Sequence, residues 1–265
     1  MAVNYYASAA GLRSKHERAR TDSGRSFPLW ALEQAAPSAD PGITILDAGC
    51  GWGRFTWVLL DTYGLAPEQV VACDLSFGML RSMATERRPR PPLVQATIRA
   101  LPFASNTFDF VLAAHVLYLV PDLRQGVREL ARILQPDGVQ LATTNSVAIE
   151  PLLMRIHAQA LECLGLQNND TTDEDFTLEN GADILHVGFD EIETHRFEDS
   201  ATFDGLHDFL DTYRTLGRYQ SLSADVRDAV LTVVHRLATE ELDRRGVLRS
   251  DVLMAAFVCR CPKRD

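Results

Sequence analysis

Short apolar runs alternate along the centre of the chain with stretches in which apolar residues recur every three or four positions. Five of these runs have the length and the flanking polar residues of buried strands, at 43–49, 70–74, 93–97, 108–114 and 139–145. Phe55, Val58 and Leu59 illustrate the helical spacing between them. Strands and helices in alternation are typical of an open, doubly wound parallel sheet with helices on both faces.

The pattern changes after residue 145, where longer helical stretches interrupt the strands. The expected elements are a helix at 150–166, a strand at 189–197, helices at 203–218 and 223–244, and a last strand at 254–262. Connections this long within a compact domain are usually functional. We therefore expect a single domain over 1–265. Its cap insertions are placed at about 146–188 and 198–250, and a helical N-terminal lid at about 1–40.

The 265 residues carry a formal net charge of −10, with a pI near 5.2. Proteins that bind nucleic acids usually present a basic face, so no nucleic-acid partner is expected. A short basic run at 86–92 contains three prolines and is more typical of a surface turn. Pro136, Asp137 and Gly138 predict another turn, before the strand at 139–145. No apolar window reaches the roughly 18 residues of a membrane span, so we expect no membrane partner and a cytoplasmic location.

The five cysteines lie mostly within apolar runs, which is typical of small core residues rather than of a disulfide framework. No pair of them is matched by a second pair of Cys or His at the spacing of a zinc site. The acidic stretch 168–179 has Asp173 at the position where a calcium loop needs glycine. The sequence therefore predicts no metal site.

The stretch LDAGCGWGRF, residues 46–55, follows the first predicted strand and leads into a helix. Ligands of open parallel sheets bind at the carboxyl ends of the strands, so this loop is expected to line the site. Glycines at 49, 51 and 53 permit positive φ and let a ligand lie against backbone N–H groups. Dinucleotide-binding loops have the spacing G-x-G-x-x-G, whereas this loop has G-x-G-x-G with Asp47 ahead of it. An acid at that place suits a cationic ligand group better than a pyrophosphate.

Asp74 ends the second predicted strand, at the same edge of the sheet. A carboxylate there can accept two hydrogen bonds from a ribose diol, as it does in dinucleotide-binding folds. The two acids together predict a nucleoside ligand with a cationic tail. A dehydrogenase-type fold with an altered glycine loop is the alternative.

Four segments resemble, in order and spacing, the motifs of class I S-adenosylmethionine-dependent methyltransferases of the type 11 kind. They are ILDAGCGWGRF, VVACDLSFGML, ATIRALPFASNTFDFVLAAHVLYLVPDL and LARILQPDGVQLATTNS. The resemblance implies a Rossmann-like, doubly wound sheet of seven strands, the last of them antiparallel, with helical cap insertions. It also implies S-adenosylmethionine as the cofactor. Further along, FTLENGADIL resembles bacterial members that modify small molecules, often in natural-product pathways.

The resemblance also assigns residues to the cofactor. Contacts with its methionine part are implied for Asp47, Ala48, Gly49 and Gly51. Asp74 would hold the ribose hydroxyls, and Leu75 would lie against the adenine.

The adenine edge would meet Thr97 and Ile98. Members of the family commonly have an acidic residue at the position of Thr97, so adenine binding would depend on the Thr97 hydroxyl or on the Ile98 backbone. Tyr6, with Tyr5 beside it, would close the pocket over the cofactor, as N-terminal tyrosines do in similar proteins.

Three residues that follow the fourth and fifth predicted strands are candidates for the acceptor side. His115 would act as a general base or contact the acceptor, and its alternative role is structural or cofactor-contacting. Tyr118 and Asn145 would orient the acceptor. Metal-assisted catechol methylation needs carboxylates where His115 and Thr144 stand, which again predicts no metal.

The predicted function is methyl transfer to oxygen or nitrogen of a small-molecule acceptor, in bacterial natural-product or secondary metabolism. One alternative is a cofactor-binding partner or regulatory protein without catalysis. Another is a methyltransferase that acts on protein or RNA, which the acidic balance and the long cap disfavour. The oligomeric state, a monomer or a homodimer, is not specified by these patterns.

Overall fold

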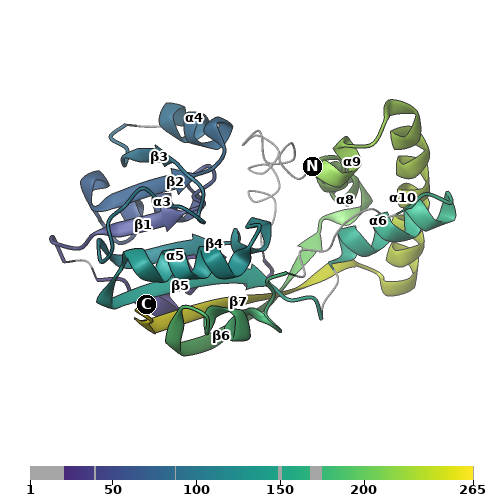
Figure 1. Ribbon diagram of the computed structural model, residues 1–265. Coiled ribbons are helices and arrows are strands. Elements are labelled where there is room, and N and C mark those ends of the chain that lie inside the picture. Colours follow the sequence, from purple (N-terminus) through teal and green to yellow (C-terminus); the bar gives the residue numbers. More distant parts are fainter. Residues whose placement is uncertain (1–20, 39, 87, 149–150, 168–174, 265) are drawn as a thin grey trace.

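The computed structural model describes residues 21–38, 40–86, 88–148, 151–167 and 175–264 (Figure 1). Its strands are β1 (Ile45–Ala48), β2 (Val70–Asp74), β3 (Leu93–Gln95), β4 (Phe108–Ala114), β5 (Leu134–Asn145), β6 (Phe189–Phe203) and β7 (Leu248–Pro262). Its α-helices are α2 (Phe27–Ala35), α3 (Arg54–Asp61), α4 (Phe77–Glu86), α5 (Leu123–Ile133), α6 (Leu152–Cys163), α7 (Gly181–Leu185), α8 (Gly205–Arg214), α9 (Gly217–Gln220) and α10 (Ala224–Arg245). Two short 3₁₀ helices, η2 (Pro67–Gln69) and η3 (Leu117–Leu119), precede β2 and follow β4.

The seven strands form one sheet in the order β3-β2-β1-β4-β5-β7-β6. The pairs from β3 to β5 are parallel, whereas β7 runs antiparallel to both β5 and β6. The predicted seven-stranded α/β fold with an antiparallel last strand is therefore confirmed. The strand order reverses between β1 and β4, and a crevice for a ligand is expected at the carboxyl ends of these two strands.

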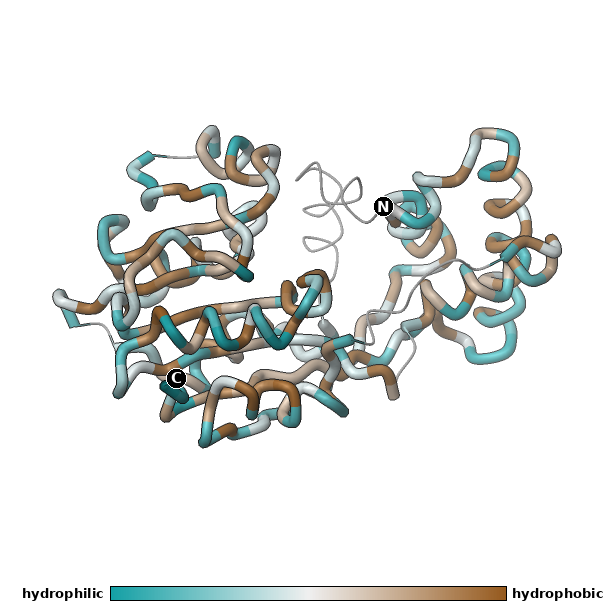
Figure 2. Tube along the Cα trace, viewed as in Figure 1, coloured by the Kyte–Doolittle hydropathy of each residue, from teal (hydrophilic) through white to brown (hydrophobic). Residues whose placement is uncertain are grey.

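Helices cover both faces of the sheet (Figure 1). One face packs against α2, α3 and α4, and the other against α5, α7 and the loop after β3. Brown and teal alternate from turn to turn along α5 in Figure 2, as expected for a helix with one face on a core. A strand between two helical layers is buried on both of its faces, and all four residues of β1 are buried.

The turn predicted at Pro136–Gly138 is wrong. Strand β5 begins at Leu134, which pairs with Phe108, and it continues through these residues to Asn145. The register shifts between Phe108 and Phe110, so the extra residues are accommodated as an irregularity within the strand pair. Proline and glycine in this segment mark a bulge rather than the end of an element.

Strands β6 and β7 are longer than predicted, with 15 residues each. Their pairing extends from Phe189–Pro262 to Phe203–Leu248, whereas β5 pairs with β7 only as far as Met254. The segments 198–203 and 248–253 therefore form a two-stranded arm beyond the sheet. The cap insertion predicted at 198–250 is corrected accordingly, because both of its ends are strand.

The arm carries a helical lobe, made of α6, α8, α9 and α10, which lies apart from the sheet in Figure 1. This lobe has its own apolar core, which includes Ile156, Phe209 and Val234. From the cap predicted at 146–188 only α6 joins the lobe. Helix α7 instead packs under the sheet beside α5, with Leu185 fully buried there.

Helix α2 does not form the lid that was predicted for residues 1–40. Phe27, Ala31 and Leu32 are buried against the sheet, so this helix belongs to one of the covering layers. The chain just before it lies along the arm, since Asp22 N donates to Ser200 O at 2.6 Å. Residues 1–20, which include Tyr5 and Tyr6, lie outside the described residues.

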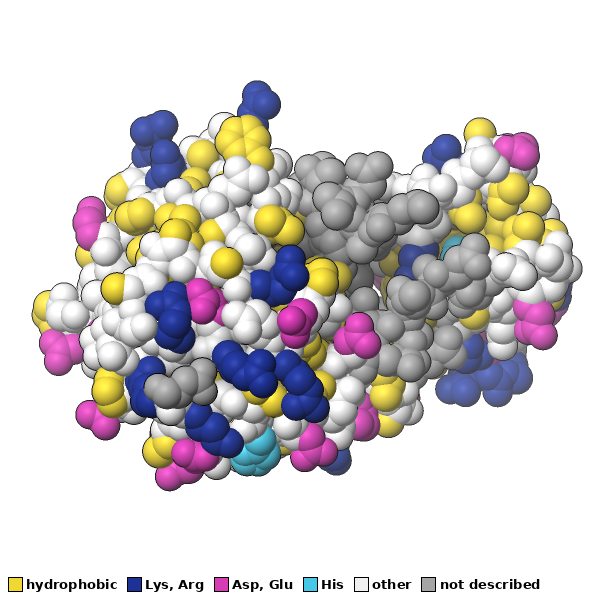
Figure 3. Space-filling model, in the orientation of Figure 1, with side chains coloured by type: hydrophobic (Ala, Val, Ile, Leu, Met, Phe, Trp, Pro, Cys, Tyr) yellow, Lys and Arg dark blue, Asp and Glu magenta, His cyan; other side chains and the backbone are white. Residues whose placement is uncertain are grey.

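The remaining sequence expectations concern surface and chemistry. On the face shown in Figure 3, basic and acidic side chains are interspersed. All five cysteines are free thiols, and Cys50, Cys73 and Cys259 are buried. Within the described ranges, no helix combines the length and the apolarity that crossing a bilayer requires.

Candidate functional site

The glycine loop lies where the sequence predicts, at the carboxyl end of β1. The N–H groups of Gly49 and Cys50 both donate to the carbonyl of Cys73, at 2.7 and 2.9 Å, and so tie the loop to β2. Gly49, Gly51 and Gly53 have φ of 81°, 56° and 92°, in the left-handed region. The positive φ predicted for this loop is confirmed, and it turns the chain directly into α3.

Two of these glycines are needed for different reasons. A Cβ on Gly49 would lie 2.4 Å from Cγ2 of Val116, so this position packs tightly against the segment after β4. A Cβ on Gly51 would meet no atom within 4 Å. The backbone of Gly51 is therefore open on that side, and a ligand can approach it closely.

Asp47 lies beneath the loop and is only 1 % exposed. Its Oδ2 accepts a hydrogen bond from the hydroxyl of Thr56 at 2.5 Å, which ties β1 to α3. Burial raises the pKa of Asp47 to about 7, the charge of Asp74 adds to the shift, and the Thr56 hydrogen bond opposes it. A carboxyl group with this pKa is only partly ionised near neutral pH, and a cationic ligand beside it would favour its charged form.

Asp74 is half-buried at the end of β2 and faces the loop. Its Oδ2 accepts from Gly51 N at 2.8 Å, and its Oδ1 accepts from Ser76 N at 2.7 Å. Burial raises the pKa of this carboxyl, and these two backbone hydrogen bonds oppose the shift. Each oxygen keeps a further lone pair, so the group can still accept hydrogen bonds from a ligand diol.

The positions expected around a flat base lie beside Asp74. Leu75 is 64 % exposed and Phe77 is 65 % exposed, which is unusual for large apolar side chains. Ile98 is buried in the core, so its backbone rather than its side chain is available to a ligand. The hydroxyl of Thr97 accepts from Arg99 N at 3.4 Å, and its carbonyl accepts from Ala100 N.

His115 follows β4 directly and has a backbone φ of 50°, which is uncommon for a residue with a side chain. Its N–H donates to both the carbonyl and the hydroxyl of Thr143, at 3.0 and 3.2 Å. Its ring lies against that of Phe27 in α2, with centroids 5.2 Å apart. A strained backbone fixed on several sides is typical of functional positions.

Asn145 and Tyr118 reach the same edge of the sheet. Asn145 is the last residue of β5 and is exposed, while β4 and β5 remain paired up to Ala114 and Thr143. Tyr118 is half-buried in η3, where it packs against the core. All three candidate acceptor residues thus lie at or just after the carboxyl ends of β4 and β5, with the His115 ring against α2 and Tyr118 on the core of the α5 side.

Glu179 is a residue of this edge that the sequence analysis did not single out. Its carboxylate accepts hydrogen bonds from the Ser146 hydroxyl and from Val147 N, the latter at 3.2 Å. Leu178 N donates to Asn145 O at 3.0 Å. The stretch 176–180 is therefore bound to the end of β5, and no periodicity in the sequence could have indicated that contact.

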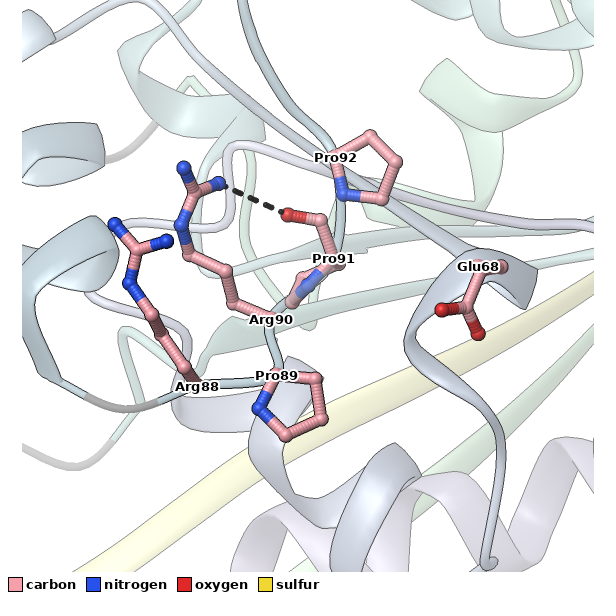
Figure 4. A pocket seen from close by; sticks show the side chains of 6 residues that line it. All are labelled: Glu68, Arg88, Pro89, Arg90, Pro91 and Pro92. Atoms are coloured by element: carbon pink, nitrogen blue, oxygen red, sulfur yellow. Dashed lines mark hydrogen bonds between the residues drawn. The ribbon is translucent and has the colours of Figure 1, made fainter.

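The basic run lies away from this edge. Arg88 and Arg90 line a shallow hollow before β3, at the opposite edge of the sheet, and their side chains extend side by side in Figure 4. Arg90 Nη1 donates to Pro91 O at 3.4 Å. Across the described parts of the chain, no three His, Cys, Asp or Glu side chains are grouped so that they could hold a metal ion.

The glycine loop and the strands around it match a known family. Residues 46–142 fit the sequence profile described as "Methyltransferase domain". This part of the chain is a methyltransferase domain. The match extends from β1 to the middle of β5, so it contains the loop, Asp74 and His115 but not the arm or the helical lobe.

A curated relative supports the assignment of the methyltransferase domain. The malonyl-[acyl-carrier protein] O-methyltransferase of Legionella pneumophila subsp. pneumophila is 39 % identical over 102 residues, which are 38 % of this chain and 35 % of that protein. The chain matches its curated relatives over about half of their length or less.

Solved structures share the fold over most of the chain. A protein from an antibiotic biosynthesis pathway of Anabaena variabilis has a TM-score of 0.66 at 14 % identity, covering 92 % of this chain and 99 % of that one. Phosphoethanolamine N-methyltransferase 2 of Haemonchus contortus, in complex with S-adenosyl-L-methionine, has a TM-score of 0.52 at 19 % identity, covering 88 % of this chain and 52 % of that one. At 14 % and 19 % sequence identity, the structural similarity shows only that the fold is shared.

Proposed function

We propose that this chain binds S-adenosylmethionine and transfers its methyl group to oxygen or nitrogen of a small-molecule acceptor. The observation that carries the proposal is the hydrogen bond from Gly51 N to Asp74 Oδ2, which joins the open glycine loop to a carboxylate at the end of β2. This arrangement presents backbone and carboxylate side by side at the switch point of the sheet.

The residues of the site fit the parts of this cofactor. The open side of Gly51 accommodates the methionine chain, and the remaining lone pairs of Asp74 can accept from the two ribose hydroxyls. The exposed side chain of Leu75 offers an apolar surface for the adenine. A ligand with a sulfonium and an ammonium group would favour the charged forms of Asp47 and Asp74, whose pKa values burial raises in the free protein.

When bound, S-adenosylmethionine supplies a methyl group on a positively charged sulfur. The chain then has to align the acceptor and exclude water, because methyl transfer is an in-line displacement in which charge is lost. His115 can take a proton from an acceptor hydroxyl or ammonium group, and the contacts with Thr143 and Phe27 orient it. Tyr118 and Asn145 would orient the acceptor.

The acceptor is proposed to be small and to belong to secondary metabolism. Support comes from the relative named for malonyl-[acyl-carrier protein] and from the structural neighbour assigned to an antibiotic pathway. No metal and no nucleic acid take part in this proposal.

The test is calorimetric titration with S-adenosylmethionine and S-adenosylhomocysteine, with NAD as a control ligand. Micromolar binding of the first two and none of NAD is expected. Asp74→Asn should weaken S-adenosylhomocysteine about 10- to 100-fold, because a charge-assisted hydrogen bond contributes about 1.5–3 kcal/mol.

The matched control is Asp183→Asn, which changes an exposed acid of α7 on the far side of the core and should leave binding unchanged. His115→Ala should also keep most of the affinity, since its proposed partner is the acceptor. Binding of NAD alone, or equal losses for Asp74→Asn and Asp183→Asn, would contradict the proposed function.

A further inference from the structure

Strand β6 is one of the two edge strands of the sheet (Figure 1). It has 15 residues, whereas β3 at the other edge has three. The backbone N–H and C=O groups on the outer side of an edge strand face no neighbouring strand, and proteins usually keep such edges short or cover them. The length of β6 therefore calls for an explanation.

One half of the outer edge of β6 is covered by the segment that precedes α2. Asp22 N donates to Ser200 O at 2.6 Å, and Asp22 Oδ1 accepts from Thr202 N at 2.9 Å. Arg25 Nη2 donates to Glu198 O at 2.6 Å. Since β7 lies on the other side of β6, these contacts show that residues 198, 200 and 202 direct their backbone groups outward.

The other half of this edge is open. The pairing of β6 with β7 is regular from Glu191 onward, so the backbone groups of Ile192, Thr194 and Arg196 also point outward. Among the described residues, no hydrogen bond occupies these groups. The side chains of Thr194 and Arg196 are exposed, as expected where nothing lies over the strand.

A second copy of the same segment fits this open edge. In an antiparallel pair with a two-fold axis at Thr194, Ile192 lies opposite Arg196 of the second copy and Thr194 lies opposite itself. Each outward N–H of these three residues then meets an outward carbonyl of the other strand. Threonine opposite threonine is also a favourable cross-strand pair.

The charges of the edge agree with this register. Glu193 lies opposite His195 of the second copy, in a pair of the closely spaced type, and the symmetry repeats the pair. Within one chain, Nε2 of His195 lies 3.7 Å from Oε2 of Glu193 and has no hydrogen-bond partner in the described ranges. A pairing centred on Glu193 would instead set two glutamates against each other.

We propose that two copies of this chain form a dimer through the open edge of β6, with antiparallel pairing centred on Thr194. The two sheets then become one continuous sheet. The pairing ends at Glu198, because Arg25 occupies the edge there, and its guanidinium faces Asp190 of the second copy. This inference goes beyond the proposed function, and the crevice at β1 and β4 lies several strands away from the interface.

The first test is sedimentation velocity of the full chain over a range of concentrations. The wild type is expected to show a reversible equilibrium between monomer and dimer. Thr194→Pro should raise the dimer dissociation constant about 10- to 100-fold, because it removes the hydrogen bond that each Thr194 N donates across the axis. Proline is tolerated at this position of the monomer, since the N–H points away from β7. Thr194→Val keeps the N–H and is the matched control, which should leave the dimer intact.

A charge exchange tests the register. His195→Glu sets two acids opposite each other on both sides of the axis and should weaken the dimer about 5- to 50-fold. Addition of Glu193→His to that variant restores unlike groups across the axis and should recover most of the affinity.

The outcomes are decisive in both directions. A wild type that stays monomeric up to about 100 µM overturns the proposal, as does a dimer that Thr194→Pro leaves intact. A double variant as weak as His195→Glu alone overturns the register centred on Thr194. Loss of the dimer in Thr194→Pro and His195→Glu with unchanged circular dichroism, together with recovery in the double variant, supports it.

Discussion

At the scale of single residues, the site depends on carboxylates held at unusual depth. Asp47 is 1 % exposed and has one side-chain hydrogen-bond donor, Thr56. Its position under the loop places this carboxyl group close to the ligand site and away from water. The same burial makes the ionised form costly, and that cost should be measurable in the stability of the free protein.

We expect Asp47 to make the free energy of unfolding depend on pH. Its pKa is about 7 when folded and near the ordinary 3.8 when unfolded, so between these values only the folded state holds the proton. Stability from this group is therefore fully present below about pH 4, falls as pH rises, and is lost above about pH 7, by about 2–4 kcal/mol in total.

Urea unfolding of the wild type and Asp47→Asn at pH 5, 6, 7 and 8 checks this expectation. The variant cannot ionise at this position, so it should gain stability relative to the wild type as pH rises. A difference between the two proteins that stays constant over this range would show that Asp47 is not the titrating group.

Glu179 shows which residues a motif leaves out. The glycines and both acids could be predicted, because positive φ, strand ends and hydrogen-bonding capacity follow from residue type and order. Glu179 was missed because its partners Ser146 and Val147 are more than 30 positions away in the chain.

At the scale of elements, β5 contains a polar side chain that its surroundings do not satisfy. Gln140 is 0 % exposed, and neither its amide nitrogen nor its amide oxygen has a hydrogen-bond partner among the described residues. It shares a face of the strand with Thr144, whose hydroxyl donates to Phe176 O at 2.6 Å. One strand face thus holds an unsatisfied and a satisfied polar group, which makes a direct comparison feasible.

Gln140→Met is expected to stabilise the protein by about 1–3 kcal/mol, because the replacement has a similar shape and leaves no buried amide unpaired. Thr144→Val should destabilise it by a similar amount, since it leaves the Phe176 carbonyl without its donor. Thermal unfolding of the two variants beside the wild type tests both signs. Destabilisation by Gln140→Met would indicate that the amide is satisfied in solution.

The strands also show where the hydrophobic periodicity of the sequence predicts secondary structure and where it does not. The strands of the parallel part were predicted because apolar runs bounded by turns are specific for buried strands. The outer halves of β6 and β7 were missed because they lie beyond β5, where residues such as Glu198, Asp199 and Asp251 remain polar. The start of β5 was missed because a bulge tolerates proline and glycine, which otherwise indicate a turn.

At the scale of the whole molecule, the apolar side chains form cores that are separate in space. The clusters on the two faces of the sheet include Leu46 and Leu112, whereas the cluster of the helical lobe includes Phe209, Tyr213 and Val230. The two-stranded arm joins the lobe to the sheet. Separate cores joined by a narrow connection are expected to open with different free energies.

Phe209→Ala is expected to loosen the lobe selectively, since removing a fully buried phenylalanine costs about 3–5 kcal/mol. Hydrogen exchange followed by mass spectrometry should rise over α6, α8 and α10 while β1 to β5 stay protected, and S-adenosylhomocysteine should still bind. Phe110→Ala, which changes a core residue of β4, is the control and should raise exchange across the sheet. Equal exchange throughout for Phe209→Ala would mean that lobe and sheet unfold as one unit.

The place of β7 in the sheet has a consequence for how the protein is made. This strand lies between β5 and β6, so neither can complete its pairing on that side until residues 248–262 have left the ribosome. The parallel strands that carry the glycine loop, Asp74 and His115 are synthesised well before that moment. The methyl-donor half can therefore assemble during translation, while β6 and the helical lobe wait for the last strand. During that interval the exposed edges of β5 and β6 are the parts of the nascent chain most open to wrong pairing.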